Sequence, residues 1–377
     1  MPREILRLQS SYSYLPAGED RLAVVSTVLQ RRVTLGGSRD KVARALDALA
    51  AGVDADRAAE AVAEASGLRR DEAERLVAEL QRAAVLVKRS VENDVSSLDG
   101  KSLYDRQIRF LSLFESPGSS GMELNRKLQD RRIVIPGVGG TGGWIALLCA
   151  RIGIRNIVVI DWDEVELSNL HRQILYERSD IGRSKVDASA GRLTAIDDDI
   201  QVTGHNLFIE KAEDVEPIFR GADLVFNAFP PFDGNFAVGA AAIARAALRA
   251  GVPCLQMPAA QCVGPLTIPG KTACQICAKE KLEADFGYAT KVVPSLYNAG
   301  FVGAISPRQA ITSGLAVWEA ARFLSGMDRP PSLDGTVRID IAGYMNHEFI
   351  RIERRPDCPE CGSYAAEGPK SNVGDAA

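Results

Sequence analysis

The stretch that decides the fold reads IVIPGVGGTGGWIALL and spans Ile133–Leu148. An apolar, β-branched run leads into five glycines and then into residues that favour a helix. This order is typical of α/β units in which backbone N–H groups and a helix N-terminus face a phosphate. Three interpretations stay open here. The turn could hold a dinucleotide, it could hold ATP, or it could serve only close helix–strand packing.

From Arg132 onward, apolar strand patterns alternate with helical ones. The helices are expected to run through Ile152, to follow Lys185 and to cover 237–250. The expected strands are 133–137, 156–161, 201–209, 222–229 and 252–257. Such alternation predicts a Rossmann-like α/β fold, with a mostly parallel sheet and helices on both of its faces.

The first 88 residues form a separate block. Residues 4–9, 21–29 and 31–35 are short and partly β-branched, which predicts a small sheet. Three helical patterns follow. The second begins after Asp54 and ends at Gly67, and the third continues to Val87. This order predicts a small winged-helix-like α+β module.

The chain therefore divides into four predicted segments. Residues 1–88 form the front module, 89–125 a linker with one helix, and 126–362 the α/β core. The polar tail, 363–377, is expected to be disordered.

Composition excludes several classes of protein. The net charge is −4 and the pI is about 5.7, so there is no electrostatic reason to expect nucleic-acid or membrane binding. The N-terminus has no secretory signal pattern. Residues 133–150 are uncharged and long enough to cross a membrane, but five glycines and a proline argue against it. We expect a cytoplasmic protein.

The residues after the second core strand favour a triphosphate. They read DWDEVELSNLHRQ (Asp161–Gln173), and IGRSK follows at Ile181–Lys185. A dinucleotide has two phosphates, which glycine amides and a helix dipole can largely satisfy. ATP carries more charge, and cations such as Arg172 and Lys185 suit both the bound nucleotide and a departing pyrophosphate.

In this order the motifs resemble the ThiF/MoeB/MccB branch of the ubiquitin-activating-enzyme superfamily. The matching elements are the glycine turn, the two motifs after it, two CxxC pairs, and LYDRQIRF at Leu103–Phe110. The resemblance covers about 103–362. It implies adenylation, in which a carboxylate attacks the α-phosphate of ATP and releases pyrophosphate.

The resemblance also assigns roles. Asp161 would bind the ribose, with Asp163 close by. Arg106 would be an arginine finger that a partner subunit often supplies, which implies a homodimer. His171 is expected to be a bystander. The residues expected to contact the phosphates are Gly137, Gly139, Gly140, Gly142, Asn169, Arg172, Gln173 and Lys185.

The sequence departs from the family at two places. An aspartate that helps to hold Mg²⁺ normally follows the strand at 222–229, but Phe229 stands there, and Asp233 is the nearest substitute. A nucleophilic cysteine is absent from residues 278–310, so a covalent carrier step is not expected. We expect Cys149, Cys254 and Cys262 to be unreactive core residues.

Two CxxC pairs predict a structural zinc site. Cys274 with Cys277 and Cys358 with Cys361 offer four thiolates, the set that selects Zn²⁺ and fills its tetrahedral sphere. A chain without a secretion signal favours metal over disulfides.

The front module resembles the PqqD-like domains that bind leader peptides as an added strand, although a dimerisation domain is an alternative. This combination resembles the microcin C and pantocin-type peptide-modifying enzymes. It implies ATP-dependent activation of a carboxyl or amide group in a ribosomal precursor peptide. Activation of a ubiquitin-like sulfur carrier, a noncatalytic leader-binding scaffold and a nicotinamide oxidoreductase are the alternatives.

Overall fold

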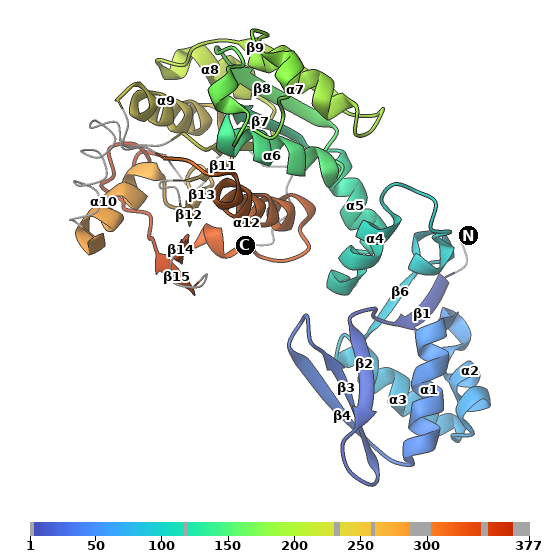
Figure 1. Cartoon of the computed structure of the whole chain (residues 1–377). Coiled ribbons are helices and arrows are strands. Elements are labelled where there is room, and N and C mark those ends of the chain that lie inside the picture. Colours follow the sequence, from blue (N-terminus) through green and yellow to red (C-terminus); the bar gives the residue numbers. More distant parts are fainter. Residues whose placement is uncertain are drawn as a thin grey trace. The chain divides into compact units, whose positions relative to one another are not determined.

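The computed structural model describes residues 4–116, 119–229, 234–257, 261–286, 303–340 and 346–364. The chain divides into two compact units, Met1–Lys127 and Leu128–Ala377. Each unit has its own sheets and its own core (Figure 1). Asp233 and most of the C-terminal tail lie outside the described residues.

The first unit contains two antiparallel three-stranded sheets. One has the order β5-β1-β6, and the other has the order β2-β3-β4. The strands are β1 (Glu4–Leu8), β2 (Tyr12–Pro16), β3 (Arg21–Ser26), β4 (Arg31–Gly36), β5 (Val53–Asp54) and β6 (Leu86–Ser90). Three of these strands were expected from the sequence, and the front module is α+β as predicted.

Three helices complete the module: α1 (Arg39–Ala51), α2 (Ala58–Ser66) and α3 (Arg70–Arg82). Helix α2 ends at Gly67, in the left-handed conformation, as predicted. The third helix was predicted to continue to Val87, but this is wrong. Ala84 takes a φ of 54°, and Val85–Val87 turn into β6, because that apolar run pairs with β1 and is buried there.

Strand β6 extends past position 88, the predicted end of the module. Arg89 on β6 is buried and forms an ion pair with Glu115, which is also buried. Arg7 on β1 donates to Asp94 at 2.6 Å. Buried charges therefore join the module to the segment that carries α4 (Asp105–Leu111) and α5 (Gly121–Gln129).

The second unit is built on a six-stranded sheet with the order β13-β11-β10-β7-β8-β9. All neighbouring strands are parallel except β11 and β13, so the predicted mostly parallel sheet is confirmed. The strands are β7 (Arg132–Pro136), β8 (Asn156–Asp161), β9 (Gln201–Asn206), β10 (Leu224–Asn227), β11 (Cys254–Gln256) and β13 (Leu266–Thr267).

Helices cover both faces of this sheet (Figure 1). Val134, Val158 and Val225 point to one face and pack against α8 (Ala212–Phe219) and α9 (Gly234–Ala250). The other face carries α6 (Gly140–Arg151), α7 (Lys185–Thr194) and α12 (Ser306–Ser325). The side chains of a strand alternate between faces, so these strands are apolar throughout.

A further sheet is formed by strands from the C-terminal part of the sequence. Strands β12 (Cys262–Val263), β14 (Gly335–Asp340) and β15 (Asn346–Arg351) form an antiparallel sheet, and α10 (Gln275–Phe286) lies between β12 and β14 in the sequence. Of the helices that the structure describes, none combines the length and the apolar character required to cross a bilayer.

Candidate functional site

A cavity of about 830 Å³ lies at the carboxyl end of the central strands of the second unit. It is lined by the turn after β7, the residues after β8 and β10, and the beginning of α12. Open α/β sheets bind their ligands at this edge, where loops from neighbouring strands meet. The volume is in the range of small-molecule sites.

The predicted glycine turn forms the floor of this cavity. Gly137, Gly139, Gly140 and Gly142 all line it. Gly137 takes a φ of 75°, a left-handed conformation that strains other residues. The turn leads directly into α6, whose first N–H groups have no partner within the helix and are available to an anion.

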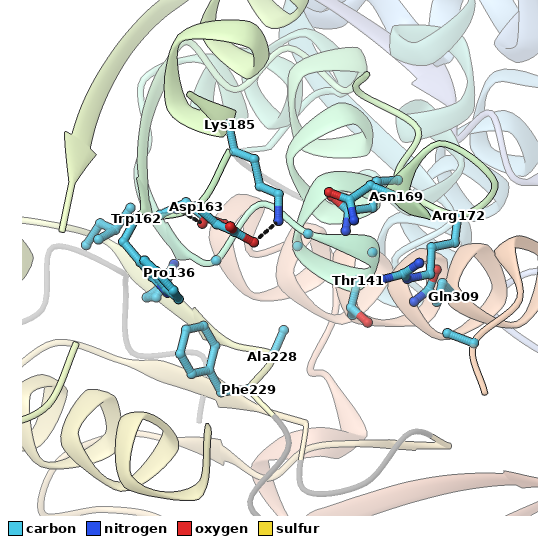
Figure 2. A pocket seen from close by; sticks show the side chains of 18 of the residues that line it. Pro136, Thr141, Trp162, Asp163, Asn169, Arg172, Lys185, Ala228, Phe229 and Gln309 are labelled. Atoms are coloured by element: carbon cyan, nitrogen blue, oxygen red, sulfur yellow. Dashed lines mark hydrogen bonds and ion pairs between the residues drawn. The ribbon is translucent and has the colours of Figure 1, made fainter. Parts of the chain in front are cut away.

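Asp161, Asp163 and Lys185 form a connected group beside the turn. Asp161 ends β8 and accepts hydrogen bonds from the backbone N–H groups of Val138 at 2.9 Å and of Asp163 at 3.0 Å. Lys185 Nζ lies 2.5 Å from Asp163 Oδ2 (Figure 2). Burial raises the pKa of Asp161, while the charge of Lys185 and these hydrogen bonds act to lower it.

The segment between these residues supplies the other predicted ligands. Asn169, Arg172 and Gln173 line the cavity, and Asn169 and Gln173 are buried. Arg172 donates to the carbonyl oxygen of Ser168 at 2.7 Å. His171 also lines the cavity, and its ring nitrogens lie near the carbonyl oxygens of Ser168 and Ala304.

Two predicted site residues stay predictions. Asp233 lies outside the described residues. Arg106 lies on α4 of the first unit, and its role as an arginine finger stays a prediction.

The described carboxylates do not form a prepared Mg²⁺ site. Phe229 lies in the cavity after β10, and its ring packs so closely on Gly137 that a Cβ there would lie 2.6 Å from it. Asp161 already accepts two N–H bonds, and Asp163 is paired with Lys185. The third carboxylate, Glu166, accepts from Ser168 Oγ at 3.0 Å.

The sequence interpretation missed one wall of the cavity. Helix α12 contributes Arg308, Gln309 and Thr312. They belong to no quoted motif, although Ser306–Pro307 is an ordinary helix start. Trp162 and Phe208 were missed as well. Their rings meet edge to face at 5.1 Å, and both line the cavity.

The four cysteines of the CxxC pairs come together as predicted. Their Sγ atoms all lie within 4.8 Å of one another, and all four residues are buried. Cys274 lies 3.6 Å from Cys358, and Cys277 lies 3.7 Å from Cys361. Sulfurs about 2.3 Å from a tetrahedral Zn²⁺ are about 3.8 Å apart, so the cluster matches a zinc site.

The remaining three cysteines are buried, as predicted. Burial raises the pKa of the thiol groups of Cys149 and Cys254. It also raises the pKa of Cys262 to about 11. All three therefore stay protonated and unreactive near neutral pH.

A glycine turn before a helix N-terminus, a carboxylate at the end of β8, cavity cations and a closed four-cysteine cluster are the features expected of a nucleotide-dependent α/β enzyme. The sequence pattern of the ThiF family matches residues 104–360. The chain belongs to the ThiF family and is an enzyme of the ATP-dependent adenylyltransferase type.

The chain is similar in sequence to two adenylyltransferases. The sulfur carrier protein ThiS adenylyltransferase of Bacillus subtilis (strain 168) is 30% identical over 268 residues, which cover 69% of this chain and 71% of that protein. The molybdopterin-synthase adenylyltransferase of Escherichia coli (strain K12) is 28% identical over 267 residues, covering 69% and 95%.

Solved structures extend the likeness in fold to almost the whole chain. E. coli MccB in complex with AMPCPP and MccA has a TM-score of 0.70 at 20% identity, covering 95% of this chain and 100% of that one. PaaA has a TM-score of 0.68 at 21% identity, covering 92% and 99%.

Proposed function

We propose that this enzyme uses ATP to activate a carboxyl or amide group in a ribosomally synthesised precursor peptide. One observation carries the proposal. The two curated relatives described above match 69% of this chain, whereas the fold of MccB, crystallised with MccA, matches 95%. The extra likeness includes the front module, which sulfur-carrier activation does not explain.

In the proposed reaction, a carboxyl oxygen of the peptide attacks the α-phosphorus of ATP. The bond from this phosphorus to the oxygen that bridges to the β-phosphate breaks, and pyrophosphate leaves. Asp161 would hold the ribose, and the edge-to-face pair of Trp162 and Phe208 offers an aromatic surface to the base. Lys185 and Arg172 would stabilise the charge that develops on pyrophosphate. Phosphorylation would use the same groups, with attack at the γ-phosphorus and loss of ADP.

The front module would select the peptide. Strands β2 and β4 are the edges of one sheet of the first unit, and a leader segment could add to either edge by backbone hydrogen bonds. We also propose that the enzyme works as a homodimer in which Arg106 reaches the cavity of the partner subunit.

Sulfur-carrier activation is the second candidate function, because the relatives matched by sequence include sulfur-carrier adenylyltransferases. The absence of a cysteine from residues 278–310 argues against a later covalent transfer.

Nucleotide turnover tests both candidates together. The full-length chain is incubated with ATP and either a peptide encoded by a short reading frame beside its gene or a carrier protein that ends in Gly-Gly. Peptide-dependent AMP and pyrophosphate support adenylation, whereas ADP and phosphate support phosphorylation. Faster turnover with the carrier protein would favour the second candidate. Calorimetric peptide binding without nucleotide turnover with either substrate would contradict both candidates.

A further inference from the structure

The side chain of Gln309 is buried at the cavity, and no described residue donates a hydrogen bond to its amide oxygen. The residue is 8% exposed, and within the described part of the chain Gln309 Oε1 has no hydrogen-bond partner. It lies on the first turn of α12, against the first residue of α6. A Cβ on Gly140 would lie 2.1 Å from Gln309 Nε2, so the amide packs directly on the phosphate-binding turn.

Leaving a buried acceptor unpaired carries an energetic cost, and such a group at a cavity indicates a ligand that donates to it. Phosphate groups and carboxylates are acceptors at neutral pH and cannot fill this role. The donors of ATP are its ribose hydroxyls and its adenine amino group.

Those ATP donors belong at the other end of the cavity. Asp161, the proposed ribose ligand, is adjacent in sequence to Trp162, and Trp162 and Asp163 lie across the cavity from Gln309 (Figure 2). A second substrate can supply the donor that reaches Gln309, and a peptide carries one in every backbone amide.

Arg308 supplies the matching charge. Its half-buried side chain lines the same cavity one residue before Gln309, and among the described residues no carboxylate forms an ion pair with its guanidinium. A guanidinium binds carboxylates through two parallel hydrogen bonds. A cation beside an unsatisfied amide suits an amino-acid residue that presents a carboxylate together with an N–H group.

We infer that Arg308 and Gln309 form the subsite for the acceptor residue of the peptide. Arg308 binds the carboxylate that is activated, and Gln309 Oε1 accepts a hydrogen bond from a neighbouring amide N–H. This subsite rests on the proposed function, because it places an acidic acceptor residue beside the proposed phosphate site. It assigns substrate recognition to α12, while nucleotide binding stays with the motifs after β7 and β8.

Binding of small probes tests the subsite without requiring turnover. One probe is propionate, a carboxylate without an N–H group, and the other is N-acetyl-glutamate N′-methylamide. Both are titrated by NMR into the full-length chain, with and without AMPCPP. The variants are Gln309→Met and Arg308→Met. Arg151→Met is the control, because Arg151 is exposed at the opposite end of α6 and does not line the cavity.

We expect Gln309→Met to weaken the amide probe about tenfold and to leave propionate unchanged, since one hydrogen bond is lost only in the first case. Arg308→Met should weaken both probes about tenfold or more. For Gln309→Met and Arg308→Met, the affinity for AMPCPP and the melting temperature should equal those of the control variant. This pattern separates substrate recognition from loss of folding.

Other results would overturn the inference. A loss of AMPCPP affinity with unchanged probe binding would make these residues phosphate ligands. Equal losses for both probes in Gln309→Met, or no loss for either, would leave Gln309 a packing residue. Wild-type chain that binds neither probe would refute the subsite. Probe binding without ATP turnover by any peptide would instead remove the proposed function alone.

Discussion

Replacing Lys185 with methionine should abolish most turnover while barely changing stability. Lys185 is 5% exposed, and its Nζ lies 2.5 Å from Asp163 Oδ2. Methionine keeps most of the length and volume of the side chain but removes its charge. The variant therefore removes the positive charge of Lys185 and changes the packing of the side chain little.

The effect on stability is small because Asp163 remains hydrated. Two unit charges at this separation attract by about 1–2 kcal/mol in water-like surroundings. Burying the ammonium group offsets part of this energy, and the Asp163 side chain is 42% exposed, so it keeps water when its partner is lost. We expect a loss below about 1 kcal/mol, which lowers the melting temperature by less than about 4 °C.

The effect on turnover is larger because charge on the leaving pyrophosphate develops in the transition state. Removing one such stabilising group typically costs about 3–4 kcal/mol, or roughly 10²–10³ in kcat. The substrate binds before that charge appears, so KM for ATP should rise much less than kcat falls.

Pyrophosphate release at saturating acceptor, together with a thermal melt, gives both quantities. Lys281→Met is the matched control, because Lys281 forms an ion pair of 2.8 Å with Asp285 and does not line the cavity. A fall in kcat of less than about fivefold, or a fall matched by the control, would refute the assignment of Lys185 to the departing phosphates.

The remaining predictions concern metal, packing and pH. The purified chain should contain one Zn²⁺, and Cys358→Ser should release it and lower the melting temperature, as elemental analysis and calorimetry would show; metal-free protein of unchanged stability would contradict a structural role. Gly137→Ala should destabilise the protein by about 1–3 kcal/mol, because Gly137 has a φ of 75° and the new Cβ meets the Phe229 ring; adding Phe229→Leu should restore part of that loss in denaturant unfolding, and no recovery would mean that backbone strain alone matters. Burial raises the pKa of Cys262 from its usual 9.0 to about 11. The contribution of the Cys262 thiol to the free energy of unfolding is therefore fully present below pH 9 and is lost as pH rises through about 11. Rapid alkylation of the folded protein at pH 8 would contradict this prediction.

The sequence could predict the parts of the site that lie close together along the chain. A strand, a glycine turn and the residues after the next strand form one local unit, so Gly137, Asp161 and Lys185 could be placed from their spacing. The cysteine cluster was predictable because thiolate pairs have few other uses. Gln309 and Arg308 were not predictable, because they reach the cavity only through the packing of α12 on α6, which leaves no local pattern.

The same distinction explains the error in the front module. Helical spacing continues through Ala84 into Val85–Val87, and nothing local ends the helix there. The end is set by β1, a strand about eighty residues earlier, whose edge is available to Leu86–Ser90. A partner so distant in sequence leaves no signal in the segment itself.

The ion pair between Arg7 and the buried Asp94 limits how this enzyme can be recombined with its relatives. A chimera spliced at position 88 would take Arg7 on β1 from one parent and Asp94 from the other, so the two members of this pair would come from different proteins. Grafts that exchange everything up to Lys127 keep both charges in one piece. The proposed peptide preference should therefore be exchanged together with α4 and Arg106.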